Sequence, residues 1–371
     1  MEPTTTIKPE PKPDSENGTV FAIDFNEPGT TKFYKRDRVP DAGEVFEGKT
    51  VEADNIYTGS RMSELNSDTL YTSIWDNTDR FKARSVEVVD SGIKLSNLPK
   101  FHDTHNISSL NLTKLDTSQE TSFYRLFDTI DKLCVLDVST WDTSSVTNMN
   151  DCFNACGSKS TQTFTVDLSG WDTSSVTYMD EMFQDSNIKV KGLRNFDTSK
   201  VISMCSMFSG SPAANKDIEN WNTSSLENIH YMFSYSTSTD SLNLSKWNVS
   251  QVNDFESLFK NSKFNSLNLS GWNVSGSEQL DYPDRVLQFM FSGCSVSNID
   301  VSNWNISNVD DTSSMFEGCS ALTRIVGISD WNTKRLNLVY SMFKDCPNLV
   351  LDLSGWNVEY VNTLLPLDFN T

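Results

Sequence analysis

The sequence predicts an α+β repeat solenoid in which each unit of about 25 residues contributes one short strand and one short helix or 3₁₀ turn. The first observation behind this prediction is a recurring aromatic position, here named the aromatic column. Its members lie 25 to 32 residues apart, and Leu115 extends the series backward by one unit. We expect the column to form the structural core, and its members are Trp141, Trp171, Phe196, Trp221, Trp247, Trp272, Trp304, Trp331 and Trp356.

The second observation is a pair of apolar residues before each member of the aromatic column. They stand five and three positions ahead of it, as in Leu242/Leu244 and Leu267/Leu269, with a polar residue between them. Such alternation is typical of a short strand with one buried face.

The third observation is the spacing of apolar residues after the column. They fall at plus five, eight, eleven and twelve, as in Val176, Met179, Met182 and Phe183. Steps of three, three and one would place these side chains on one side of a short helix or 3₁₀ turn. A strand and a short helix cannot bury their apolar faces alone, so we expect the units to stack.

A tripeptide directly after the column resembles the catalytic signature of an aspartic protease, as in Asp172-Thr173-Ser174. Four units carry Asp at this position and six later units carry Asn, for example Asn222. A general acid replaced by Asn could not transfer protons, whereas a turn or cap residue tolerates the change. We therefore expect a structural role for Asp172 and no enzymatic activity.

This interpretation predicts that Asp142→Asn is nearly neutral, because later units carry Asn there. Asp142→Ala should instead lower the free energy of unfolding by about 0.5–2 kcal/mol, because Ala offers no side-chain oxygen to a backbone N–H. Urea denaturation of both variants measures the difference. Equal destabilisation by Asn and Ala would contradict the structural role.

Charge excludes several classes of partner. The formal net charge is −20, with 50 acidic and 30 basic residues. No basic stripe is available to displace counterions from phosphates, so we expect no nucleic-acid partner. The same balance disfavours docking on an anionic membrane, and no apolar run approaches the length of a membrane span. We expect a monomer without direct membrane insertion.

The two ends of the chain differ from the repeats. Residues 1–18 are rich in Pro and Thr and predict a disordered linker. Residues 19–106 contain alternating and β-branched runs, so they predict a β-rich N-terminal cap or a small independent domain. The solenoid of about ten units, the last incomplete, is expected over 107–371.

Cysteine and histidine give weak signals. Of seven cysteines, Cys156, Cys294, Cys319 and Cys346 lie three residues after the recurrent Phe of their units, where other units carry Ser. We expect free thiols at a position that requires a small residue. His102, Asp103 and His105 suggest a metal site without a third convincing ligand, and His230 stands alone in the sequence. No metal or cofactor is expected.

The residue between the two buried strand positions must face outward, because strand side chains alternate. Stacked strands would turn these residues into a polar ladder, with the insertion at 276–285 as its rim. The ladder could serve only solubility and bonding along the stack, or it could bind a glycan or a basic protein segment. Repulsion between Asp137 and Asp167 would then be relieved by a cationic partner or by protonation. The candidate ligand face comprises Asp137, Asp167, Asp217, Asn243, Asn268, Asp300, Asp352, Tyr282 and Arg285.

The units "LNLSKWNVSQVNDFESLFKNS" (242–262) and "LDLSGWNVEYVN" (351–362) resemble the BspA-like leucine-rich repeats of bacterial surface proteins, also catalogued as a lipoprotein repeat. The resemblance covers roughly residues 107–363. It implies a noncanonical leucine-rich-repeat fold and an extracellular, cell-attached protein of the cell surface or cell wall. The implied function is that of an adhesin fragment, with a host or cell-surface protein or glycan as partner. A mechanical stalk or spacer that presents another domain is the alternative.

Overall fold

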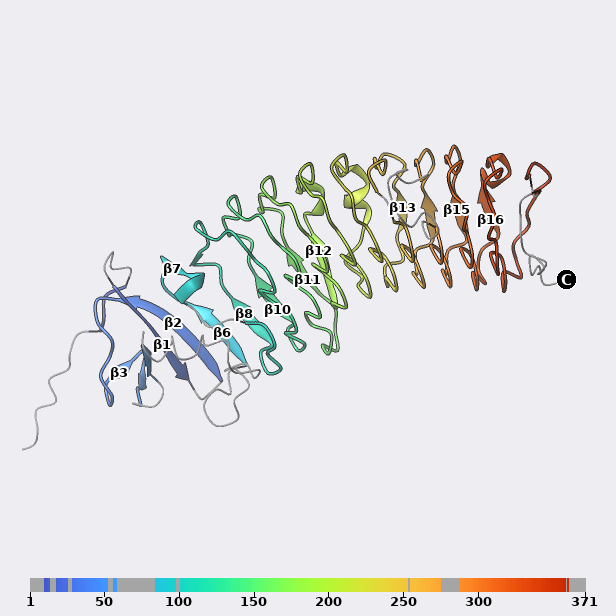
Figure 1. Ribbon diagram of the computed structural model, residues 1–371. Coiled ribbons are helices and arrows are strands. Elements are labelled where there is room, and N and C mark those ends of the chain that lie inside the picture. The colour runs from blue at the N-terminus through green and yellow to red at the C-terminus, as the bar shows by residue number, and fades with distance from the viewer. Residues whose placement is uncertain are drawn as a thin grey trace, which may run out of the picture.

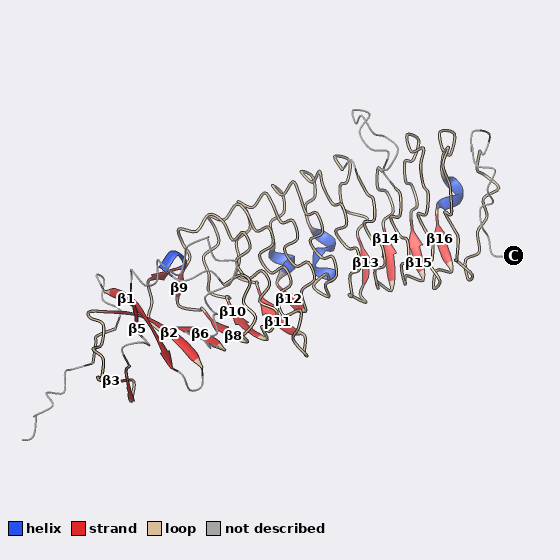
Figure 2. Ribbon diagram, turned by 60° about the horizontal axis from the view of Figure 1, so that its bottom comes forward, coloured by secondary structure: helices blue, strands red, loops and turns tan. Residues whose placement is uncertain are grey.

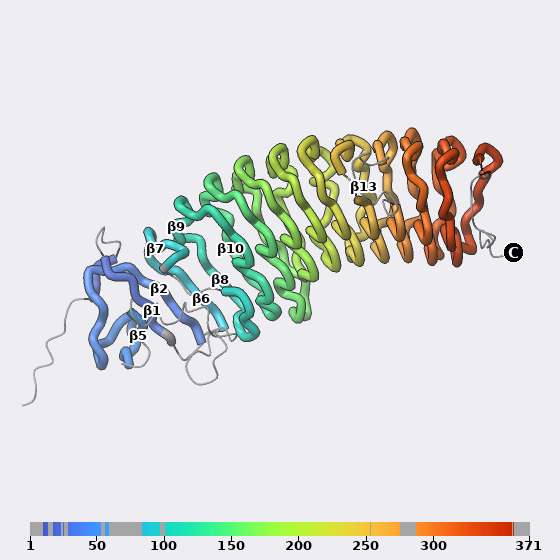
Figure 3. Tube along the Cα trace, in the orientation of Figure 1, coloured from blue at the N-terminus to red at the C-terminus, as the bar shows by residue number. Residues whose placement is uncertain are grey.

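The chain forms a repeat β-solenoid of about nine turns with few helices. The computed structural model describes residues 10–13, 18–25, 29–52, 56–58, 84–97, 101–252, 254–274, 287–357 and 359. Successive turns, or coils, stack into an elongated and gently curved rod with the N-terminal sheet at one end (Figures 1 and 3).

Short strands of most coils build the side of the rod on which the strands gather, and η4 (Lys216–Asn220) takes the place of a strand in the coil of Trp221 (Figure 2). The pairs are parallel and in register, so that Leu242, Leu267, Ile299 and Ile325 form one buried row. The prediction of a half-buried strand is confirmed for these units. The strands are β8 (Ser109–Asn111), β10 (Val135–Asp137), β11 (Phe164–Asp167), β12 (Ile188–Lys191), β13 (Ser241–Asn243), β14 (Ser266–Asn268), β15 (Asn298–Asp300) and β16 (Arg324–Val326).

The short helix or 3₁₀ turn predicted after the aromatic column is not formed, because a series of consecutive turns occupies its place. In the unit of Trp171, the N–H groups of Met179, Glu181, Phe183 and Asp185 donate to carbonyls of the next coil at 2.8–3.0 Å. The residues between them close local turns, such as Gln184 to the Glu181 carbonyl. A helix would bond these N–H groups to carbonyls of the same segment, whereas here every second N–H donates to the next coil.

Left-handed residues make this alternation possible. Glu181 and Asp185 have φ of 55° and 50°, and equivalent residues recur four positions apart in the other coils. The same apolar spacing therefore buries one face of a chain of turns. We call the residues from plus seven to plus fifteen after the column the turn segment.

In the described part of the repeat region the helices are 3₁₀ turns, and three of them end directly before the aromatic column. They are η3 (Leu193–Asn195), η4 (Lys216–Asn220) and η6 (Ile328–Asp330), while η2 (Leu95–Asn97) lies in the first coil. Gly192 precedes η3 with φ of 98°, and a Cβ there would lie 2.5 Å from the Ser169 backbone of the preceding coil. Only glycine fits such a close approach.

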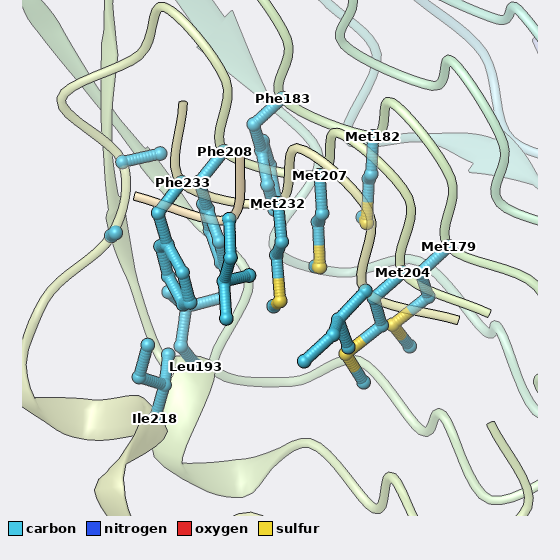
Figure 4. Packing of buried hydrophobic residues seen from close by; sticks show 14 of the residues in the cluster. Met179, Met182, Phe183, Leu193, Met204, Met207, Phe208, Ile218, Met232 and Phe233 are labelled. Atoms are coloured by element: carbon cyan, nitrogen blue, oxygen red, sulfur yellow. The ribbon is translucent and has the colours of Figure 1, made fainter. Parts of the chain in front are cut away.

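The core consists of stacked columns of identical or similar side chains (Figure 4). Rings of the aromatic column are nearly parallel, as in Trp247 and Trp272 with centroids 6.5 Å apart and planes at 9°. The recurrent Phe of the turn segment forms a second stack, as in Phe183 and Phe208 at 5.6 Å. All members of the aromatic column are buried except Trp356, which is half-buried near the end of the described coils. The column thus lies in the core of the described coils, with Trp356 at its partly buried end.

The indole N–H groups tie neighbouring coils together. Trp247 Nε1 donates to the Ile218 carbonyl at 3.0 Å, and the same carbonyl accepts the backbone N–H of Trp221 at 3.1 Å. Six other tryptophans of the column donate in the same way. Trp331 is the exception: it is buried, and its Nε1 has no hydrogen-bond partner among the described residues.

The N-terminal segment continues the solenoid sheet and also has a core of its own. The sheet runs in the order β10-β8-β6-β2-β1-β5, so its antiparallel N-terminal strands extend the parallel strands of the first coils. Ala22 and Phe33 face the solenoid core, whereas Phe21, Ile23 and Tyr34 pack on the opposite face. The strands are β1 (Thr19–Phe25), β2 (Thr30–Arg36), β3 (Val45–Phe46), β4 (Lys49–Thr50), β5 (Ile56–Thr58), β6 (Ser85–Val88), β7 (Ile93–Lys94) and β9 (Leu115–Asp116).

Two boundaries differ from those that the sequence suggested. The first coil begins at β6, since β6 pairs with β8 and β7 pairs with β9, so stacking starts before residue 107. Residues 10–13 of the predicted linker also have a defined place. Pro13 bridges to Arg36, and the Lys12 N–H donates to Asp37 at 2.9 Å.

The indole bonds lead to a prediction on Trp247 and Trp331. Trp247→Ala should lower the free energy of unfolding by about 3–5 kcal/mol, because it opens a cavity in the stack. Trp247→Phe should cost about 1 kcal/mol more than Trp331→Phe, because only the first loses a hydrogen bond. Urea denaturation followed by circular dichroism measures all three. Equal costs of the two Phe variants would show that the indole bonds contribute nothing.

Candidate functional site

The tripeptide after the aromatic column forms a turn that repeats along the rod. Asp142 accepts the Ser144 N–H at 3.1 Å and the Ser144 hydroxyl at 2.7 Å. Asp172 and Asn222 likewise each accept the backbone N–H of the residue two positions later in the chain. The turn role of Asp172 is confirmed, and it does not depend on a following helix.

The Ser144 hydroxyl and N–H lower the pKa of Asp142, since both stabilise the carboxylate. A carboxylate whose pKa falls on folding stabilises the folded state above its unfolded pKa. That contribution is lost as the pH drops through the folded pKa.

The Thr of the tripeptide joins adjacent coils. Thr143 is buried and donates its hydroxyl to the Asp172 carbonyl at 2.8 Å, while the Asp172 N–H donates back to the same hydroxyl at 2.8 Å. Thr223 and Asn248 repeat this exchange. Three later units have buried Val249, Val274 and Ile306 instead, so the position accepts a β-branched side chain with or without the hydroxyl. The sequence analysis missed this role.

Most members of the predicted ligand face engage their own chain. The first side-chain oxygen of Asp137 accepts the Ser139 N–H and hydroxyl, and Asn243 binds Ser245 in the same way. Asp167, Asn268, Asp300 and Asp352 each accept the N–H two residues on. In the aspartates among these residues, the turn uses one carboxylate oxygen only. Tyr282 and Arg285 lie outside the described residues.

Two members of the ladder are paired with cations of a neighbouring coil. Lys191 lies 2.7 Å from Asp167, and Arg194 lies 2.6 Å from Asp217, which belongs to η4 and not to a strand. Lys191 and Ser169 lower the pKa of Asp167 to about 2. The predicted repulsion between Asp137 and Asp167 is therefore wrong for Asp167, because a lysine of the next coil stabilises its charge.

Exposed tyrosines mark the turn segments. Tyr124, Tyr178, Tyr235 and Tyr340 are large side chains that are 41–57% exposed. Other coils have small or polar residues at the equivalent positions, such as Ser203 beside Tyr178 and Asn261 after Tyr235. The signal for them in the sequence is an aromatic residue outside the apolar spacing of the repeat.

Two histidines near the first coils face different carboxylates. His102 Nδ1 lies 2.9 Å from Asp103, and His105 Nδ1 lies 2.9 Å from Asp131. The two imidazoles thus do not converge on one point.

No helix among the described residues is long and apolar enough to cross a membrane.

A comparison with protein families decides where the chain belongs. The family described as "Mycoplasma protein of unknown function, DUF285" matches residues 96–188, 184–282 and 285–366, which is well over half of the sequence. The chain belongs to the DUF285 family. The three matches follow one another along the solenoid, so each DUF285 match spans several coils. Comparisons of this DUF285 chain with curated proteins and with solved structures gave no match.

None of the seven cysteines, all of which lie in described parts of this DUF285 chain, forms a disulfide. Cys294 and Cys319 donate their thiols to the Phe259 and Phe291 carbonyls of preceding coils at 2.7 and 2.9 Å. Burial raises the pKa of the Cys294 thiol to about 12 and also raises the pKa of Cys156. Free thiols at a small, buried position agree with the sequence analysis.

Thiol labelling of the folded chain should therefore be selective. A maleimide at neutral pH should modify exposed Cys134 first and leave Cys152, Cys156, Cys294 and Cys319 unreacted until the chain unfolds. Mass spectrometry of labelled peptides measures the order. In denaturant without reductant all seven should react, and a protected pair there would reveal a disulfide that contradicts the structure.

Proposed function

We propose that this chain is a non-catalytic binding scaffold, an adhesin fragment of the cell surface or cell wall that contacts a host or cell-surface protein or glycan. The proposed extracellular location and the finer relation to BspA-like leucine-rich repeats rest on the repeat sequence. The stacked coils support the proposal, because a rod of repeats offers an extended surface with many equivalent positions.

The observation that carries the proposal is the set of exposed tyrosines on the turn segments. The repeat itself explains the buried columns, the Asp/Asn turns and the Thr bonds. It does not explain Tyr124, Tyr178, Tyr235 and Tyr340, since other coils fold with small or polar residues there. Tyrosine is enriched in binding interfaces because it combines a large apolar ring with a polar tip.

The polar ladder remains the second candidate face. Its second carboxylate oxygens, such as those of Asp137 and Asp300, could accept hydrogen bonds from sugar hydroxyls or basic side chains. Because the turns use only one oxygen of each carboxylate, the ladder can serve folding and binding together.

Two double variants test which face binds. Tyr178→Ser with Tyr235→Asn removes two rings and introduces residues that neighbouring coils already carry, so the fold should persist. Asp137→Asn with Asp300→Asn keeps the turns and removes two charges. We expect the tyrosine variant to lose at least about tenfold in affinity for cells or for a glycan array. A loss of this size is typical of aromatic residues that become buried when an interface forms.

The ladder variant serves as the matched control, and its binding should change less than that of the tyrosine variant. A loss confined to the ladder variant would move the site to the strands. If both variants fold and bind like the parent, the adhesin proposal fails. The uninterrupted stacking of coils then favours a stalk or spacer that presents another domain.

A further inference from the structure

The stacking of coils brings a histidine of one repeat close to two carboxylates of the next repeat. His230 stands at plus nine in the unit of Trp221, and Asp254 and Glu256 stand at plus seven and plus nine in the next unit. Their ligand atoms all lie within 4.8 Å of one another. The sequence analysis left His230 alone, because this proximity depends on the register between coils.

Alternation around a buried residue directs the three side chains outward. His230 follows buried Ile229, and Asp254 and Glu256 flank buried Phe255. Equivalent residues of adjacent coils are about 4.8 Å apart in such a stack, so His230 and Glu256 are neighbours on one row. The row is half-buried, which leaves the cluster accessible from one side.

The imidazole of His230 is held in place and still lacks a partner. Its ring lies 4.1 Å from the Tyr231 ring, centroid to centroid. His230 Nε2 has no hydrogen-bond partner although it is shielded from solvent. Glu256 Oε2 is 3.9 Å away, which is too far for a hydrogen bond. A buried nitrogen without a partner is unfavourable unless something else satisfies it.

The carboxylates are also only partly used. One Asp254 oxygen accepts the Glu256 N–H at 2.8 Å, which fixes the carboxylate and leaves its other oxygen available. Asp254 and Glu256 bring two carboxylates to this cluster, so a cation would be attracted to it.

We propose that His230, Asp254 and Glu256 form a Zn²⁺ site on the turn segments of two adjacent coils. One imidazole nitrogen and two carboxylate oxygens match the donors that Zn²⁺ accepts, whereas Ca²⁺ and Mg²⁺ select oxygen ligands. Bonds of about 2.0–2.2 Å in a tetrahedral site place ligand atoms about 3.4 Å apart. The observed separations need only small side-chain rotations to reach that value. Three protein ligands leave a fourth position open toward solvent.

The repeat supplies matched variants for the test. Asn150 stands at the position of His230, Asn148 and Asn228 stand at that of Asp254, and Gln288 stands at that of Glu256. The variants His230→Asn, Asp254→Asn and Glu256→Gln therefore introduce residues that the fold already carries. Cys134→Ser is included in all proteins, because an exposed thiol could bind zinc by itself. His102→Gln serves as a control for histidine content.

Isothermal titration of the chelator-treated chain with ZnCl₂ at pH 7.5 should show one site. Each of the three variants should weaken it by about tenfold or more, while His102→Gln leaves it unchanged. CaCl₂ or MgCl₂ in equal amount should not displace the zinc.

Co²⁺ substitution distinguishes the ligand types. We expect a spectrum without sulfur-to-metal charge transfer, because no thiol belongs to the proposed set. Three results would each overturn the proposal. They are the absence of stoichiometric zinc binding, zinc binding that the three variants leave unchanged, and a sulfur-to-metal charge-transfer band. Circular dichroism of each variant confirms that the fold is retained, so that lost binding reports on the ligands.

Discussion

The backbone hydrogen bond between adjacent coils is the interaction on which the rest of this structure depends. In the turn segments every second N–H donates to the next coil, and the strands pair in parallel on another side. An isolated repeat has no neighbouring coil and cannot form these bonds. A single unit would leave its backbone groups to water and would expose its Met, Phe and Trp side chains. Stability is therefore a property of neighbouring pairs of coils.

This dependence explains the local strain in the repeat. Each turn segment contains residues with φ near 55°, many of which carry side chains, such as Glu181, Tyr231 and Ser257. A non-glycine residue in this conformation costs about 1–3 kcal/mol and persists only where the surroundings determine it. The bonds to the neighbouring coil provide that determination. The side-chain columns follow from the same spacing, since rings and thioethers of equivalent residues lie directly above one another.

The polar residues of the repeat stabilise the coil corners in three ways. Asp and Asn accept the N–H of the second residue onward, Thr exchanges hydrogen bonds with the next coil, and the indole N–H shares a carbonyl with the local turn. These roles account for a tripeptide that resembles a protease signature. The exposed tyrosines and the His230 cluster have none of these three roles, so the repeat fold does not explain their presence.

The sequence by itself determined the period, the buried face of the strand, the aromatic core and the turn role of Asp172. These features repeat with every unit, and periodic burial leaves a periodic pattern in the chain. The conformation after Trp171 was beyond the sequence, because apolar steps of three, three and one suit a helix and a chain of turns equally well. Only the left-handed residues and the bonds to the next coil distinguish the two. The pairing of Asp167 with Lys191, and the proximity of His230 to Asp254 and Glu256, likewise depended on the tertiary structure. Contacts across coils are set by the register of stacking, which a linear spacing does not contain.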